Sequence, residues 1–159
     1  MPYLILMAAL VVLDQVVKVL VRTNIELGGA VPFLPHVLQL TFVKNTGAAF
    51  SIFEEHTWIL TLVSLAASIL LAVLLVKKVF PHPFAMVCLS VVLAGAVGNL
   101  IDRAFFGYVT DMFQTIFMNF AVFNVADICV VCGGIAFCVY YLLFQGKEDK
   151  GHDAPASEG

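Results

Sequence analysis

Two asparagine–aspartate pairs are the residues whose types and spacing best fit chemistry. Both read N-x-x-D: Asn99 precedes Asp102, and Asn124 precedes Asp127. Residues three apart lie on one face of a helix, so each asparagine is predicted to hydrogen-bond the carboxylate one turn further on. A third carboxylate, Asp111, lies between the two pairs. Two such helices meeting at one membrane surface would bring these acids and amides together, which is the arrangement that paired-carboxylate chemistry needs.

That chemistry is the hydrolysis of an amide. Two carboxylates a few ångströms apart resist double ionisation and share a proton. One then takes a proton from water while the other polarises a carbonyl group, with no metal ion and no covalent intermediate. No H-E-x-x-H zinc motif is present, and no histidine adjoins the acids (His36, His56, His82, His152). We therefore expect no metal and no cofactor. From the residues alone two other interpretations stay open, a proton or ion path and buried polar groups that hold helices together.

The composition indicates a membrane protein. The chain has 159 residues, of which 62% are hydrophobic and only 12% charged, and the apolar residues occur in long runs. The net charge of −3 and the eight lysines and arginines argue against a nucleic-acid partner. All four cysteines lie within apolar runs and are interpreted as packing residues (Cys88, Cys129, Cys132, Cys138).

Four apolar runs are long enough to be transmembrane helices, at about residues 3–21, 58–76, 84–101 and 121–144. Turn residues and two-residue alternation predict a small β-rich element within about 23–56. Asn45 or Thr46 would then cap a short interfacial helix. Residues 102–120 are interpreted as an aromatic-rich loop at the interface. The predicted fold class is an all-α membrane protein with four transmembrane helices, a small extracytoplasmic β element and a short interfacial helix.

The same pattern predicts the domain organisation and the orientation. Residues 1–145 are expected to form a single four-helix domain, and the polar residues 146–159 a disordered tail. The short loop with Lys77 and Lys78 lies on the same side of a four-span chain as the tail. By the positive-inside rule both termini are predicted to be cytoplasmic. The clustered aspartates then lie at the outer face of the membrane.

Asp14 and Lys18 form a further charged pair inside the first apolar run. They are spaced i,i+4 with the acid first, the order that favours a helical ion pair. In one interpretation they only neutralise each other near the membrane surface. In the other, Asp14 reaches sideways to brace the region of the clustered aspartates. Both interpretations remain open at this point.

Five motifs resemble, in order and spacing, those of the lipoprotein signal peptidase family (signal peptidase II). They are L-D-Q-V-V-K at 13–18, N-T-G-A-A-F at 45–50, G-N-L-I-D-R at 98–103, G-Y-V-T-D-M-F at 107–113 and F-N-V-A-D at 123–127. Members of this family are four-span aspartyl proteases of the bacterial inner membrane. The resemblance implies that Asp111 and Asp127 are catalytic, rather than the symmetric pair of Asp102 and Asp127. It also implies that six further residues support the site or contact substrate (Asp14, Asn45, Asn99, Asp102, Arg103, Asn124).

The resemblance further implies a function and a setting. The expected activity is that of an endopeptidase that removes the signal peptide from prolipoproteins carrying a diacylglyceryl cysteine, with cleavage just before that cysteine. The active site would lie near the outer, periplasmic face of the inner membrane. The expected partners are these prolipoproteins and membrane lipids, and the enzyme is expected to be a monomer. Family members carry a β-rich cradle and a short surface helix in the place of residues 23–56. The alternative function is a proton-coupled small membrane carrier that uses the same carboxylates.

Three positions carry separate expectations. Thr110 stands where the family usually has valine before the catalytic aspartate, and is expected to affect how Asp111 is oriented. Ile128 replaces the serine or threonine often found after Asp127. Asp102, beside Arg103 at the end of the third run, is expected to be ion-paired and to anchor the loop that carries Asp111.

Overall fold

The computed structural model describes residues 2–47 and 57–144. It contains the four predicted helices: α1 (Pro2–Asn24), α2 (Thr57–Val76), α3 (Pro83–Phe106) and α4 (Val125–Phe144). Each is long and apolar enough to cross a membrane. The predicted four-helix membrane fold is therefore confirmed. The expected interfacial helix after Asn45 and the expected polar tail lie outside the described residues.

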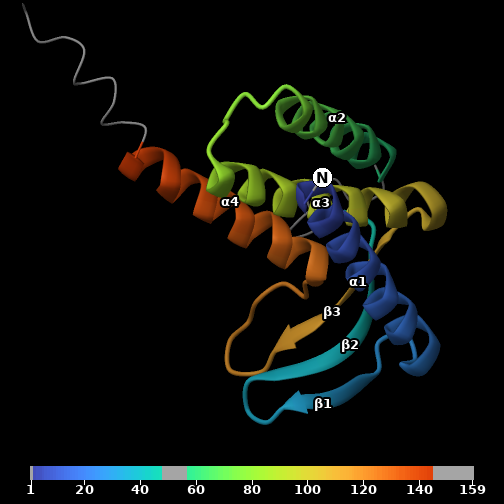
Figure 1. Ribbon diagram of the computed structural model, residues 1–159. Helices are drawn as coiled ribbons and strands as arrows, with labels where there is room; N and C mark the ends of the chain where they lie inside the picture. Colours follow the sequence, from blue (N-terminus) through green and yellow to red (C-terminus); the bar gives the residue numbers. More distant parts are fainter. Residues whose placement is uncertain (1, 48–56, 145–159) are drawn as a thin grey trace, which may run out of the picture.

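Helix α3 is the centre of the bundle, since α1, α2 and α4 all pack on it (Figure 1). Two glycines allow α3 and α4 to approach closely. A Cβ atom on Gly95 would overlap the carbonyl oxygen of Ala126, and one on Gly133 would lie 2.9 Å from Val92 Cγ2. This contact fixes the start of α4, and therefore Asp127, against the middle of α3.

The ends of α3 follow from local chemistry. At its N-terminus His82 Nδ1 accepts a hydrogen bond from the Phe84 N–H, and Pro83 occupies the first helical position. At its C-terminus Gly107 adopts a left-handed conformation (φ +75°), and its N–H donates to the Arg103 carbonyl oxygen. The helix therefore continues past the predicted end at residue 101 and turns sharply into the next strand.

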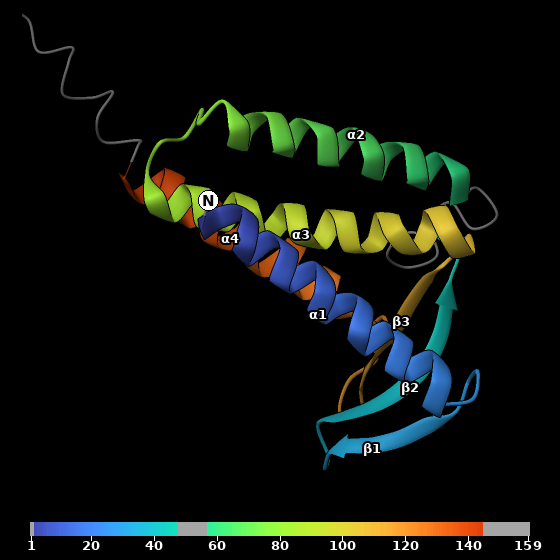
Figure 2. The same ribbon diagram turned by 45° about the vertical axis from the view of Figure 1, so that its right-hand side comes forward.

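A three-stranded antiparallel sheet lies at one end of the bundle, beside the C-terminus of α1 (Figure 2). Its strands are β1 (Ala30–Leu34), β2 (Leu38–Asn45) and β3 (Val109–Thr115), in the order β1-β2-β3. Strands β1 and β2 confirm the predicted β-rich element and pair as an antiparallel hairpin. The interpretation of residues 102–120 as a loop was wrong, because β3 forms there. It gives no alternating signal, since Val109, Thr110, Asp111 and Met112 are all buried.

The register of β2 and β3 places residues of the site side by side. Asp111 pairs with Val43, and Val109 pairs with Asn45. Alternate residues of a strand share a face, so Asp111 and Asn45 lie on the same face of the sheet. The sheet is held to α1 by a small core of Val21, Phe42 and Met112.

Candidate active site

Asp111 and Asp127 line the same cavity, which has a volume of about 680 Å³. Its polar lining includes residues of β2, α3, β3 and α4 (Lys44, Asn45, Asn99, Arg103, Asp111, Asp127) and of the connecting segments (Thr46, Asn119). Much of the remaining wall is apolar (Val43, Val109, Phe120, Val122, Phe123, Ile128, Val131). The fold therefore brings the two acids that the family resemblance selected to one chamber, although they come from different elements.

Asp127 is fixed by the first turn of α4. Its N–H donates to Asn124 Oδ1 at 2.9 Å, and the Asn124 N–H donates to Asp127 Oδ2 at 3.1 Å. This reciprocal pair is a capping box, which satisfies free N–H groups at the helix start. The N-terminal end of a helix also favours a negative charge. The second N-x-x-D motif thus forms a local contact, but through backbone N–H groups. The side-chain amide of Asn124 donates to Asp111 rather than to the Asp127 carboxylate.

The first N-x-x-D motif behaves differently. The spacing had predicted a hydrogen bond from Asn99 to Asp102. Instead, Asn99 Nδ2 donates to Asp127 Oδ1 at 2.8 Å. The prediction of a local bond there was wrong because the close α3–α4 contact offers Asn99 a partner on the other helix. Asn99 and Asn124, the asparagines of the two motifs, therefore both form hydrogen bonds with Asp127.

Asp111 is almost completely buried and is held by two amides. Asn45 Nδ2 donates to its Oδ2 at 2.8 Å, and Asn124 Nδ2 donates to its Oδ1 at 2.6 Å. Burial, followed by the negative charge of Asp127, raises the pKa of Asp111 to about 6, and the two amide hydrogen bonds oppose this rise. A carboxyl group that keeps its proton this far above its usual range is a candidate general acid.

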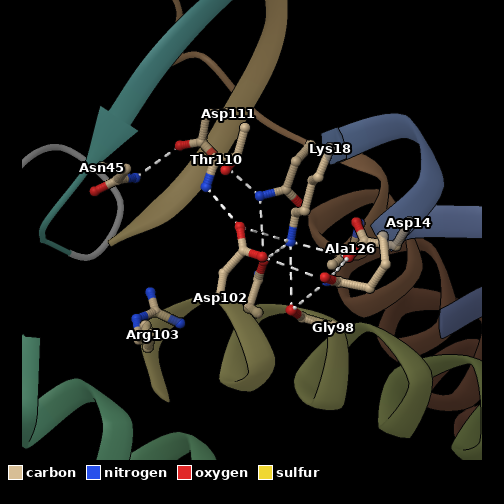
Figure 3. A network of polar contacts seen from close by, with 12 residues as sticks. Asp14, Lys18, Asn45, Gly98, Asp102, Arg103, Thr110, Asp111 and Ala126 are labelled. Carbon is tan, nitrogen blue, oxygen red and sulfur yellow. Dashed lines mark hydrogen bonds and ion pairs between the residues drawn. The ribbon is translucent and has the colours of Figure 1, made fainter. Parts of the chain in front are cut away.

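Asp102 is fully buried and belongs to an ionic network with Lys18 and Arg22, whose side chain is 15% exposed. Figure 3 shows Asp102 and Lys18 within this network. Asp102 lies 3.6 Å from Lys18 Nζ and 3.5 Å from Arg22 Nη1. Its Oδ2 also accepts the Thr110 N–H at 2.8 Å. The structure thus agrees with the expectation that Asp102 is ion-paired and anchors the segment carrying Asp111. Arg103 is set apart from this network in Figure 3.

Thr110 has a contact that the usual valine could not make. Its Oγ1 accepts a hydrogen bond from Arg22 Nη1 at 2.8 Å. Arg22 therefore connects the side chain of Thr110 to Asp102, which already binds the Thr110 N–H. The position before Asp111 is therefore held through both its backbone and its side chain.

Asp14 forms the ion pair with Lys18 and also contacts the start of α4, so both interpretations from the sequence apply. Its Oδ2 lies 2.9 Å from Lys18 Nζ, so the helical ion pair forms. Its Oδ1 accepts the Ala126 N–H at 2.9 Å, which caps α4 from α1. Gly98 makes room for this contact, since a Cβ atom there would lie 2.6 Å from Asp14 Oδ2. Asp14 therefore braces the helix turn that carries Asp127.

Comparison with known proteins identifies the family of the chain. A family model described as Signal peptidase (SPase) II matches residues 6–144. The chain belongs to the signal peptidase II family. Similar proteins include the lipoprotein signal peptidase of Enterococcus faecalis, which is 43% identical over 94% of this chain and 92% of the relative. That of Lactiplantibacillus plantarum is 44% identical over 84% of this chain and 89% of the relative.

Solved structures of bacterial membrane enzymes have a fold similar to that of this chain. One bacterial membrane enzyme superposes with a TM-score of 0.85 at 27% identity, covering 98% of this chain and 94% of that one. A second gives a TM-score of 0.81 at 30% identity, covering 90% and 94%. The predicted enzyme class, a multi-pass membrane aspartic peptidase, is confirmed. The alternative of a proton-coupled carrier finds no support in these comparisons.

Sequence reasoning missed three supporting residues of this signal peptidase II site. Lys18 was recognised only as the partner of Asp14, although its Nζ also donates to Asn99 Oδ1 at 3.0 Å. Gln15 Nε2 donates to Asp14 Oδ2 and to the Gly98 carbonyl oxygen, both at 3.1 Å. Arg22 was not selected at all. Its spacing was a usable signal, because positions 14, 18 and 22 follow each other at four-residue intervals on one face of α1.

Proposed function

We propose that this chain is an endopeptidase of the bacterial inner membrane that removes signal peptides from diacylglyceryl-modified prolipoproteins. It cleaves the peptide bond that precedes the lipid-bearing cysteine. Membership of the signal peptidase II family supports this proposal, as do the similar proteins named lipoprotein signal peptidase. One observation carries it furthest: Asp111 and Asp127 line a single cavity and are electrostatically coupled.

In the proposed mechanism the two carboxyl groups divide the proton transfers. Asp127 is ionised and takes a proton from water, whose oxygen attacks the carbonyl carbon of the substrate. Asp111 enters protonated and donates to the carbonyl oxygen, which gives a neutral tetrahedral intermediate. The C–N bond then breaks as Asp127 passes its proton to the leaving amine and Asp111 recovers its proton from the hydroxyl group. The cycle returns both acids to their starting states.

The remaining polar residues keep the two acids in place or contact the substrate. Asn45, Asn99 and Asn124 supply the amide donors, while Asp14 and Asp102 fix the elements that carry the dyad. Arg103 lines the cavity, and its two Nη atoms lie 3.4 Å from Ser64 Oγ and the Gly47 carbonyl oxygen. Within residues 2–47 and 57–144 its buried Nε has no hydrogen-bond partner. A guanidinium with spare donor capacity suits a peptide carbonyl of the substrate.

We place both termini in the cytoplasm and the active site near the outer face of the membrane. The support is the exposed Lys77-Lys78 connection, which lies at the opposite end of the bundle from the sheet (Figure 2). The sheet and the cavity then lie where a lipid-bearing peptide arrives. Residues 1–145 act as a single domain. The enzyme works as a monomer surrounded by membrane lipids.

A cleavage assay tests this proposal. Purified protein is mixed with a diacylglyceryl-modified prolipoprotein in the presence of a chelator, and a gel mobility shift follows release of the signal peptide. We expect cleavage of the lipidated substrate, unchanged by the chelator and abolished in Asp127→Asn. Folded protein that does not cut, or cutting that the chelator abolishes, would contradict the proposal.

A further inference from the structure

The side-chain amides around the two acids each have a defined orientation. An asparagine amide has a donor end and an acceptor end, and a half-turn about its last bond exchanges them. The donor end faces a carboxylate in each of the three cases, Asn45, Asn99 and Asn124. The reverse orientation would place an amide oxygen against a carboxylate oxygen. What holds each amide in place therefore decides whether the acids receive a hydrogen bond.

For two of these amides the holding group is a backbone N–H. The Gly47 N–H donates to Asn45 Oδ1 at 3.0 Å, and the Asp127 N–H donates to Asn124 Oδ1 at 2.9 Å. A backbone N–H is only ever a donor, so it selects the oxygen end of the amide. Both nitrogen ends are then left to face Asp111. Apart from proline, no substitution of the holding residue removes the donor of either contact.

Asn99 is held mainly by a side chain. Lys18 Nζ donates to Asn99 Oδ1 at 3.0 Å, which leaves Asn99 Nδ2 to donate to Asp127 Oδ1. An ammonium group has three donors and no acceptor, so it too selects the oxygen end. Asn124 Nδ2 adds a longer contact to the same oxygen at 3.2 Å. Of the three amides, Asn99 thus has the only orientation that depends on a lysine.

Lys18 is well fixed for this task. Its side chain is completely buried, and its Nζ lies 2.9 Å from Asp14 Oδ2 and 3.6 Å from Asp102 Oδ2. It also lies 3.4 Å from the Gly98 carbonyl oxygen. The two carboxylates offset the cost of burying the ammonium and hold it beside Asn99.

We propose that Lys18 is a positioning residue of the reaction, which acts on Asp127 through the amide of Asn99. This inference rests on the proposed function, in which Asp127 accepts a proton from water. By fixing the Asn99 amide, Lys18 keeps an N–H donor on Asp127 Oδ1 and leaves the carboxylate in one orientation toward the water. In this proposal the ion pair with Asp14 holds Lys18 in position, and the functional contact of Lys18 is its hydrogen bond to Asn99.

A double-mutant cycle between Lys18 and Asn99 tests the proposal. Single-turnover rates and melting temperatures are measured for the wild type, Lys18→Met, Asn99→Ala and the double variant, on a lipidated prolipoprotein. We expect Lys18→Met to slow cleavage roughly tenfold or more when Asn99 is present, with KM nearly unchanged. With Ala at position 99 the same change should cost less than about threefold. The melting temperature should fall in both backgrounds, because Lys18→Met removes the ion pairs with Asp14 and Asp102 in each.

Two matched variants control the cycle. Arg22→Met also removes a cation beside Asp102. In the described part of the chain Arg22 forms no hydrogen bond with Asn99, so the effect of this variant on the rate should be the same in both backgrounds. Lys77→Met, at an exposed lysine after α2, should leave rate and stability unchanged. If Lys18→Met does not fold, Asp14→Asn with Lys18→Met is compared with Asp14→Asn alone. Asparagine at position 14 retains an acceptor for the Ala126 N–H.

The outcomes separate the inference from the proposed function. Equal rate losses for Lys18→Met in both Asn99 backgrounds would overturn the role of Lys18, as would a loss confined to melting temperature. Folded wild-type protein that does not cleave the substrate would overturn the proposed function, and this inference with it.

Discussion

At the scale of single residues, the three clustered acids differ in what surrounds them. Asp102 is bound by scaffold groups, namely Lys18, Arg22 and the Thr110 N–H. Asp111 is bound by amides and lies at the wall of the cavity. The same chemical change, from carboxylate to amide, should therefore have different consequences at the two positions.

We expect Asp102→Asn to lower stability by about 2–4 kcal/mol, because it leaves two buried cations with less compensation. Substrate binding should weaken alongside turnover, since the segment carrying Asp111 loses its anchor. Asp111→Asn should retain stability and binding but lose roughly a thousandfold in rate, because an amide cannot donate and recover the catalytic proton. Melting temperature, binding of an uncleavable lipopeptide and single-turnover rate measured together would distinguish the two variants. An inert Asp102→Asn that melts and binds like wild type would instead assign catalysis to Asp102.

The raised pKa of Asp111 predicts a pH dependence. With its pKa raised to about 6, Asp111 loses its proton as the pH rises through that region, so kcat/KM should fall toward alkaline pH. Folding stability should also decline as pH rises from the ordinary value of 3.8 to about 6, because the folded state binds this proton more tightly than the unfolded chain. The descending limb of a pH–rate profile checks the first statement.

Asn45→Ala should move that limb to higher pH. The Asn45 hydrogen bond lowers the pKa of Asp111, so its removal raises the pKa further. Lys18 acts in the same direction as Asn45, and Asp127 acts against both. A limb that moves to lower pH in Asn45→Ala would contradict this account of the site.

At the scale of elements, the contact between α3 and α4 determines the distance between Asn99 and Asp127. Gly95→Ala should destabilise the protein by about 1–3 kcal/mol, because the new Cβ atom overlaps the Ala126 carbonyl oxygen and pushes α4 outward. Gly134→Ala is the matched control in the same helix pair, since a Cβ atom there meets nothing within 4 Å. It should be neutral or slightly stabilising. Thermal unfolding in detergent and cleavage rates for both variants provide the measurement.

The helices were predictable from the sequence, whereas strand β3 and the partner of Asn99 were not. The four helices follow from long apolar runs, which need no knowledge of their neighbours. Strand β3 did not, because a strand buried on both faces has no alternation and its partner β2 lies far away in the sequence. The same non-local packing redirected Asn99 from Asp102 to Asp127. The choice of Asp111 over Asp102 came from the family resemblance, since the N-x-x-D spacing alone would have paired Asp102 with Asp127.

At the scale of the whole molecule, the sheet and the Lys77-Lys78 connection lie at opposite ends of the bundle (Figure 2). The proposed orientation therefore predicts opposite accessibility for Ala30, in an exposed strand, and Lys77. The labelling uses a variant without native cysteines and a maleimide that passes the outer layers of the cell but not the inner membrane. In intact bacterial cells Ala30→Cys should react with this maleimide. Lys77→Cys should react only after lysis. Labelling of both positions in intact cells would contradict the orientation.

The ion pair within α1 has a consequence for biosynthesis. Lys18 and Asn99 are 81 residues apart, so at roughly 5–20 residues per second α1 leaves the ribosome several seconds before its polar partners in α3 exist. During that interval a lone ammonium in the bilayer would hinder insertion. Asp14 Oδ2 lies 2.9 Å from Lys18 Nζ on the same helix, so the newly synthesised α1 carries its own counter-ion for the lysine. The Asp14–Lys18 ion pair, which supports the candidate active site in the folded protein, thus also favours insertion of α1 into the membrane before α3 is synthesised.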